Sequence, residues 1–245
     1  MPTYRIDFGY DGSGFCGYAV QKGQRTVQAV LEEALFRISG PVETTVAGRT
    51  DAGVHARHQV VSFVSEKALD EGRTARSLNK MVREEIVIRG CRKVPDDFNA
   101  RFSARARTYR YRIANVPFLD PLIRHMVWHI RHPLDVGRMN AAARHLIGLH
   151  DFASFCRKAE GRSTERRVLS VDWVQDPVAG LLVFEITASS FCRHMVRSLV
   201  AACVDAGRGK LEPDALPGII AARDRNAARG AAPPRGLTLW EVLYD

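Results

Sequence analysis

The chain has 245 residues, of which 46% are hydrophobic and 26% are charged. This composition excludes disordered and collagen-like proteins, and the length allows one large domain or two of ordinary size around a real core. The 36 Lys and Arg exceed the 27 Asp and Glu by nine. This surplus suggests a polyanionic partner such as a nucleic acid, but a basic surface without such a partner explains the charge equally well.

Apolar stretches and cysteines indicate the cellular compartment. The longest apolar stretches, such as Gly180–Ile186, are too short to span a bilayer. The first residues, Met1–Asp7, contain no apolar segment of the kind found in a secretory signal. The five cysteines are odd in number and widely spaced, which is typical of reduced thiols. We therefore expect a cytoplasmic protein that is not attached to a membrane.

The first half of the chain alternates between strand and helix patterns. Thr26 is an N-cap candidate for a helix with apolar residues at helical spacing, and Gly40 is its expected end. A second, shorter helix is predicted over 75–84. Alternating or β-branched segments predict the strands, which cover residues 4–10, 44–49, 59–64, 86–94 and 108–115.

The second half repeats these kinds of element without an obvious sequence repeat. Helices are predicted over 136–149, around Val196–Cys203 and over 214–223. A hairpin is predicted from strands 168–176 and 181–189, and a last strand over 237–244. We expect an α+β fold with mainly antiparallel strands and helices on one face. Prolines near residue 120 suggest two domains, 1–120 and 121–245.

Basic residues gather in three segments. Residues 101–112 contain five arginines and three aromatic residues without an acidic one, a mixture that suits phosphate contacts and stacking of unpaired bases. The same pattern also fits an amphipathic strand with a solvated basic face. The segments 157–167 and 223–235 resemble exposed loops.

The segment Ala47–Ala56 contains the most informative polar residues. If the strand before it continues through Asp51, Arg49 and Asp51 project to the same side. A guanidinium beside a carboxylate keeps it ionised, and an ionised carboxylate can act as a nucleophile. The alternative is a polar turn with a surface ion pair, and for an isolated Arg-x-Asp that alternative is the commoner one.

Eight contiguous residues, Gly48-Arg-Thr-Asp-Ala-Gly-Val-His55, resemble the signature of the TruA family of tRNA pseudouridine synthases. Further segments resemble landmarks of that family in the same order along the whole chain. They are Tyr10–Ser13, Phe98–Ser103, Tyr109–Tyr111, Asp151–Phe155, Phe191–Arg197 and Gly236–Leu239.

The resemblance implies roles for individual residues. Asp51 matches the catalytic aspartate, and Arg49 matches the arginine implicated in pairing with it and in flipping the target base. Tyr109 matches a tyrosine that packs against the uracil, and Arg197 an arginine that reaches the aspartate from the other domain. The residues that match RNA contacts are Phe98, Asn99, Ala100, Arg101, Phe102, Arg162 and Ser163.

The resemblance also implies the reaction and its partners. The family breaks the N1–C1′ bond of uridine, turns the uracil and rejoins it through C5. This isomerisation involves no redox change and no net hydrolysis, so it requires no cofactor and no metal. The implied substrate is uridine 38 to 40 in the anticodon stem-loop of tRNA. The implied architecture is a homodimer of chains with two α+β domains, sheets joined into a central sheet, outer helices and an active-site cleft between the domains.

Two segments depart from the family's pattern. Gly17-Tyr18-Ala19-Val20-Gln21 replaces the usual Gly-Trp-Gln, and Asn79–Ile86 lacks the usual proline. Both lie outside the implied catalytic set. The alternatives to a pseudouridine synthase are a non-catalytic RNA-binding protein on the same scaffold, or an enzyme of this kind that acts on another RNA.

Overall fold

The computed structural model describes residues 1–157, 161, 163–176, 180–228 and 230–244. Contacts group the chain into two compact units. The first contains Met1–Arg105 and Thr238–Asp245, and the second contains Ala106–Leu237. The division into domains 1–120 and 121–245 stays a prediction.

The first unit contains a sheet in the order β4-β1-β3-β10, with β2 beside β3. β1 is antiparallel to both of its neighbours, whereas β10 runs parallel to β3. The strands of this unit are β1 (Thr3–Tyr10), β2 (Thr45–Val46), β3 (His55–Val64), β4 (Ile86–Val94) and β10 (Leu237–Leu243). The helices are η1 (Gly12–Gly14), α1 (Val27–Ser39) and α2 (Glu71–Met81).

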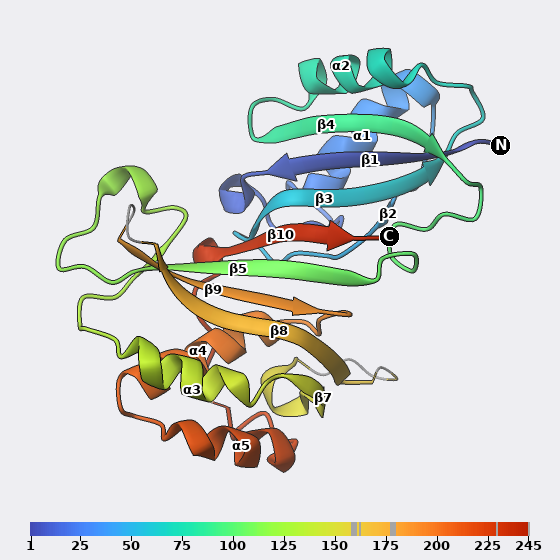
Figure 1. Cartoon of the computed structure of the whole chain (residues 1–245). Coiled ribbons are helices and arrows are strands. Elements are labelled where there is room, and N and C mark those ends of the chain that lie inside the picture. The colour runs from blue at the N-terminus through green and yellow to red at the C-terminus, as the bar shows by residue number, and fades with distance from the viewer. Residues whose placement is uncertain (158–160, 162, 177–179, 229, 245) are drawn as a thin grey trace. The chain divides into compact units, whose positions relative to one another are not determined.

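Helices and strands of the first unit form their core from residues at regular spacing. In β1 the alternate side chains of Ile6 and Phe8 are fully buried, as are Leu31 and Leu35 of α1. The Thr26 hydroxyl accepts a hydrogen bond from the Ala29 N–H and caps α1. Figure 1 shows α1 behind the strands of this unit and α2 beside β4. The apolar face of β1 is therefore the one packed in the core.

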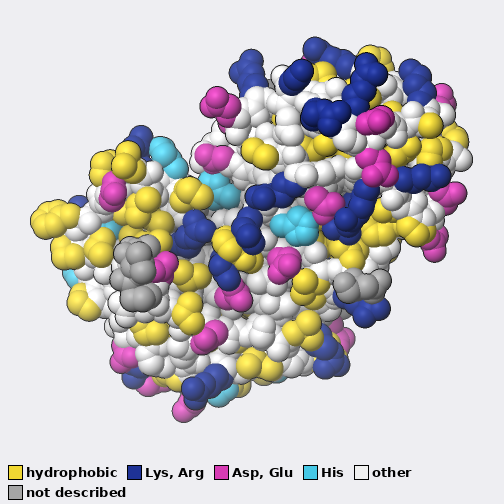
Figure 2. Space-filling view, turned by 45° about the horizontal axis from the view of Figure 1, so that its top comes forward, with side chains coloured by type: hydrophobic (Ala, Val, Ile, Leu, Met, Phe, Trp, Pro, Cys, Tyr) yellow, Lys and Arg dark blue, Asp and Glu magenta, His cyan; other side chains and the backbone are white. Residues whose placement is uncertain are grey.

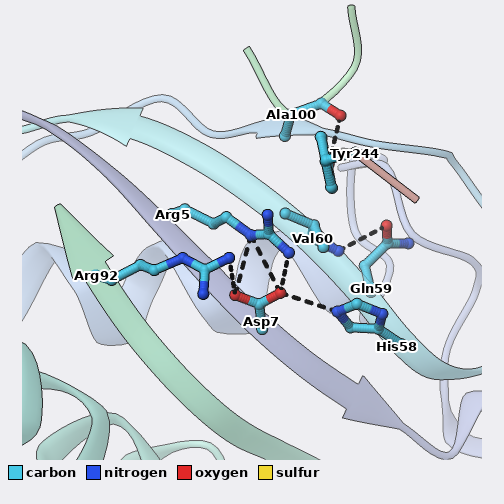
Figure 3. A network of polar contacts seen from close by, with 8 residues as sticks. All are labelled: Arg5, Asp7, His58, Gln59, Val60, Arg92, Ala100 and Tyr244. Carbon is cyan, nitrogen blue, oxygen red and sulfur yellow. Dashed lines mark hydrogen bonds and ion pairs between the residues drawn. The ribbon is translucent and has the colours of Figure 1, made fainter. Parts of the chain in front are cut away.

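Two polar side chains of β1, Arg5 and Asp7, belong to a cluster that we call the Asp7 cluster (Arg5, Asp7, His58 and Arg92). The Asp7 carboxylate lies 2.5 Å from Arg5 Nη2, 2.9 Å from His58 Nε2 and 4.0 Å from Arg92 Nη2. Figure 3 shows these side chains converging on Asp7 from β1, β3 and β4. The Arg5 guanidinium also lies 4.4 Å from the ring centre of Tyr244. Two guanidinium groups and one imidazole surround this carboxylate, which joins three strands of the sheet.

The second unit contains an antiparallel sheet in the order β5-β9-β8-β7, with β6 parallel to β5. Its strands are β5 (Ala106–Ala114), β6 (Trp128–His129), β7 (Gly148–Asp151), β8 (Glu165–Asp176) and β9 (Leu181–Ala188). Its helices are α3 (Val136–Arg144), α4 (Met195–Gly207) and α5 (Leu216–Ala222), with short turns η2 (Pro121–Ile123), η3 (Ala153–Phe155), η4 (Pro213–Ala215) and η5 (Pro234–Gly236).

Helix α4 is the most buried helix of the second unit, and α3 packs against both α4 and β8. Each unit thus combines a mainly antiparallel sheet with helices, and the predicted α+β class is confirmed. Within the described residues, no helix is long and apolar enough to cross a membrane.

Candidate active site

The loop 47–54 of the first unit carries Asp51 between β2 and β3. The strand ends at Val46, so the condition under which Arg49 and Asp51 would alternate along an extended strand is not met. Instead the Val54 N–H donates to the Asp51 carbonyl at 3.1 Å and closes a turn. Gly53 adopts a φ of 74° in that turn, a conformation that favours glycine. Asp51 is therefore fixed at the first position of a tight turn, where it is half-buried.

The segment after β1 packs against the backbone of this loop. A Cβ on Gly12 would lie 2.0 Å from the Val54 carbonyl oxygen, so the two backbones touch. A Cβ on Gly17 would lie 3.1 Å from the Thr50 oxygen, and the Tyr18 N–H donates to that same oxygen at 3.0 Å. The departure from the family's pattern at Tyr18 is therefore in direct contact with the backbone of the loop that carries Asp51, which its position in the sequence did not indicate.

Two polar side chains of the sheet, Tyr10 and Gln59, hold the loop in place. The Tyr10 and Thr50 hydroxyls are 2.8 Å apart, and the Gln59 amide donates to the Gly48 carbonyl at 2.8 Å and to the Tyr10 hydroxyl at 3.4 Å. Burial raises the pKa of Tyr10 to about 12, so this network stays neutral at physiological pH. Sequence reasoning missed Tyr10 and Gln59 as supports, although a glutamine inside an apolar strand was a usable signal.

His55 ends the signature segment and connects it to the turn after β1. It is buried, and its Nδ1 lies 3.1 Å from the Gly12 nitrogen and 3.0 Å from Asp11 Oδ1. Burial alone would raise the pKa of Asp11, but hydrogen bonds from Ser13 and the interaction with His55 lower it. These contacts indicate a structural role for His55.

The predicted uracil and arginine contacts of the second unit lie on β5 and α4. Tyr109 is buried in β5, and its ring meets the Phe191 ring edge-on at 4.9 Å between centres. Arg197 is half-buried on α4, and its Nε donates to the Ala232 carbonyl at 2.7 Å. The structure thus places Arg49 and Asp51 in one loop of the first unit, and Tyr109 and Arg197 in the second.

The segment Phe98–Ser103 divides into anchors and exposed residues. Ala100 is fully buried, and its carbonyl accepts a hydrogen bond from the Tyr244 hydroxyl at 2.7 Å. The Asn99 side chain accepts from the N–H groups of Arg101 and Phe102 and bends the segment there. Arg101 and Phe102 are exposed, with the guanidinium 5.2 Å from the ring centre. A cation and an aromatic face are presented together, and the Phe98 ring packs on Tyr244 at 5.2 Å.

Basic side chains are prominent on the face of the molecule drawn in Figure 2. Of the two predicted RNA contacts in the loop before β8, Ser163 is exposed, and its hydroxyl accepts from the Glu165 N–H at 3.1 Å. Arg162 lies outside the described residues.

The sequence profile of a family described as tRNA pseudouridine synthase matches residues 8–103 and 142–245. The chain belongs to this family. Its relatives include tRNA pseudouridine synthase A of Streptomyces griseus, 43% identical over 98% of this chain and 87% of the relative. The same protein of Listeria monocytogenes serovar 1/2a is 39% identical over the whole of both chains. That of Bifidobacterium animalis subsp. lactis is 40% identical over 100% of this chain and 94% of the relative.

The tRNA pseudouridine synthases are isomerases, so membership favours an enzyme over a non-catalytic RNA-binding protein. The ranges matched by the family's profile contain Arg49, Asp51 and Arg197, whereas Tyr109 lies between them. The full-length similarity to the relatives spans Tyr109 as well.

Proposed function

We propose that this protein converts uridine to pseudouridine in tRNA and that Asp51 is its catalytic carboxylate. The observation that carries the proposal is the rigid support of the Asp51 turn by the Gly12 backbone and by the Tyr10–Thr50 hydrogen bond. A catalytic group must be held within a fraction of an ångström to act on a bound substrate. A surface ion pair has no need of such support.

The chemistry requires one carboxylate and a substrate base out of its stack. The N1–C1′ bond breaks, a C5–C1′ bond forms, the proton on C5 leaves and N1 gains one, so atoms and electrons balance without an oxidant. Asp51 can contribute by attacking the uracil, by attacking the ribose or by removing a ribose proton. Flipping the base out of its stack costs a few kcal/mol. Contacts of the protein with the flipped base and with the space that it leaves must offset this cost.

The remaining residues are proposed to bind and orient the RNA. Arg49 and Arg197 pair with the carboxylate or occupy the space left by the flipped base, and Tyr109 packs against the uracil. The exposed pair of Arg101 and Phe102 offers a phosphate contact and a stacking face. Phe98, Asn99 and Ala100 hold that pair in place, and Ser163 and Arg162 contact the RNA from the second unit.

The finer features of the proposal come from the resemblance. The target is uridine 38 to 40 of the anticodon arm, the enzyme is a cytoplasmic homodimer, and the reaction proceeds with the chain's own side chains.

The test is pseudouridine mapping on an unmodified tRNA transcript incubated with purified protein. We expect product confined to the anticodon arm. Asp51→Asn removes the charge with little change of shape, and we expect the rate to fall by roughly 10³-fold or more while tRNA affinity is retained. Glu66→Gln is the control, because Glu66 is an exposed carboxylate elsewhere on the first unit.

Each contrary result has a definite meaning. Normal turnover by Asp51→Asn would remove Asp51 from the mechanism. Tight tRNA binding without product by the unaltered protein would support a non-catalytic binder instead. Product on ribosomal RNA but not on tRNA would move the activity to another RNA.

A further inference from the structure

A pocket of about 310 Å³ opens in the second unit at the start of α4. Three segments that are distant in the sequence line it: η3 with the loop after it, the residue before α4, and the chain after α5. The lining residues are Ala153, Cys156, Arg157, His194, Arg223 and Arg225. They include three guanidinium groups and an imidazole but no carboxylate, which makes this pocket suited to an anion.

Hydrogen bonds fix one wall of the pocket. Arg225 donates to the Ser154 carbonyl at 3.1 Å and to the Ser198 hydroxyl at 3.2 Å, and it also reaches the Ala228 carbonyl at 3.4 Å. These bonds join the chain after α5 to η3 and to α4. Arg225 is thus a fixed positive charge whose position does not depend on a ligand.

The other two arginines of the lining, Arg157 and Arg223, are exposed. The Arg157 N–H donates to the Arg193 carbonyl at 3.0 Å, so the backbone of Arg157 is tied to the segment before α4. Arg223 Nε lies 3.3 Å from Asp151 Oδ2. A guanidinium has five N–H donors, so this ion pair uses only part of the capacity of Arg223. The Asp151 carboxylate also accepts from the Thr164 hydroxyl at 2.5 Å, which divides its charge among several donors.

The start of α4 adds a further positive contribution. α4 has 13 residues, and its N-cap residue His194 adopts a φ of 66° and makes no side-chain cap hydrogen bond. The N-terminus of a helix carries a partial positive charge and favours anions, phosphate groups in particular. The start of α4 therefore favours the same kind of ligand as the arginines that line the pocket.

We propose that this pocket binds a phosphate group. The planar fork of arginine pairs with two phosphate oxygens at once, which a lysine cannot do. A water molecule occupies about 30 Å³ in the liquid, so a pocket of about 310 Å³ has room for a phosphate and part of its ester. The source is an RNA backbone phosphate or free phosphate.

An RNA source rests on the proposed function. His194 and Arg197 are three residues apart and thus within one turn of α4. The pocket therefore lies at the helix end that carries the arginine proposed to act at the target uridine. A phosphate held there would fix the RNA strand close to the flipped nucleotide.

The first experiment measures tRNA affinity over a range of salt concentrations. Asp51→Asn serves as the background, because it binds tRNA without turnover under the proposed function. Into it we introduce Arg157→Gln or Arg223→Gln, and Arg144→Gln as the control, since Arg144 is an exposed arginine at the end of α3 in the same unit. Arg225 is left unchanged because its hydrogen bonds join three segments.

The expected result is a loss of affinity of roughly 3- to 10-fold for each pocket variant and less than about 2-fold for the control. The slope of log affinity against log salt should fall by about 0.7 for each lost phosphate contact on a single strand. Arg157→Lys keeps the positive charge but loses the planar guanidinium. Its tRNA affinity should therefore lie between that of Arg157→Gln and that of the background protein. Thermal unfolding of every variant confirms that the comparison is between folded proteins.

The second experiment titrates inorganic phosphate into the chain without RNA and follows the arginine Nε resonances by NMR. Shifts that are absent from Arg157→Gln and Arg223→Gln, together with unchanged tRNA affinity, assign the pocket to free phosphate. Weaker tRNA binding assigns it to the RNA backbone. Normal tRNA binding by both variants and no phosphate-dependent shift would overturn the proposal. None of these outcomes depends on turnover, so failure of the proposed activity is measured separately by mapping.

Discussion

Gly12 is the residue on which the shape of the Asp51 loop depends most directly. Any side chain at this position collides with the Val54 carbonyl, because a Cβ would lie 2.0 Å from that oxygen. We expect Gly12→Ala to lower the free energy of unfolding by about 1–3 kcal/mol and to reduce pseudouridine formation by displacing the loop. Urea unfolding and single-turnover rates measure the two effects.

Gly218 provides the control for this substitution. It lies within α5, and a Cβ there meets no heavy atom within 4 Å. Gly218→Ala should stabilise the chain by up to about 1 kcal/mol, because alanine loses less backbone entropy in a helix than glycine. Equal stability and rate for Gly12→Ala and the unaltered protein would show that the loop does not depend on this contact.

The sequence predicts the chemistry of the candidate site better than its support. Asp51 and Arg49 stand out because the eight-residue signature is contiguous. The contacts of Tyr10 and Gly12 with the loop join residues about forty positions apart, and Gln59 reaches back from β3 to Gly48. Apart from the glutamine inside an apolar strand, no local pattern signals these contacts, so the residues that position Asp51 emerge from the fold.

Asp7 of strand β1 makes a pH-dependent contribution to the free energy of unfolding. Burial alone would raise the pKa of Asp7, but hydrogen bonds from His58 and Arg5 and the charges of Arg5 and Arg92 lower it below its ordinary value of 3.8. A carboxyl with a lowered pKa in the folded state stabilises the fold above its unfolded pKa. That stability is lost as the pH falls through the folded pKa.

Asp7→Asn should therefore destabilise the chain by about 1–3 kcal/mol at pH 7. The difference from the unaltered protein should shrink as the pH falls below about 4 toward the folded pKa. Glu33→Gln is the control, because the Arg37–Glu33 pair is exposed on α1 and such pairs contribute little. Urea unfolding at pH 7 and pH 3 measures both. An equal loss at the two pH values would mean that the charge of Asp7 is not what stabilises β1.

Elements with local signals were predicted well. The helix after Thr26 ends before Gly40 as expected, and β4 covers the predicted residues 86–94. α2 begins at Glu71 rather than at residue 75, because the Asp70 side chain accepts a hydrogen bond from the Arg73 N–H and caps it.

Elements that depend on a distant partner were predicted less well. The helix predicted over 136–149 ends at Arg144, and residues 148–151 form β7, which pairs with β8. β3 begins at His55, four residues earlier than expected, because Ala56 pairs with Tyr10. Strand pairing over long sequence separation decided these boundaries, and periodicity alone contains no information about it.

At the scale of the whole molecule, the last strand of the chain completes the first unit. Leu239 of β10 is fully buried, whereas Leu243 of the same strand is 40% exposed. We expect Leu239→Ala to lower the free energy of unfolding by about 2–5 kcal/mol. Leu243→Ala removes the same atoms from a half-solvated position and should lower it by less than about 1 kcal/mol. Denaturant unfolding of both variants measures these losses of stability. Similar losses for the two variants would show that β10 is not part of the core.

The parallel strand β10 also sets the order in which the protein can be completed during synthesis. Thr238 and Leu239 pair with His55 and Ala56, directly after the loop that carries Asp51. The ribosome must make the whole second unit, Ala106–Leu237, before that pairing is possible. At roughly 5–20 residues per second this takes on the order of ten seconds. A nascent chain that does not yet extend through β10 therefore carries Asp51 without the strand bonded beside its loop.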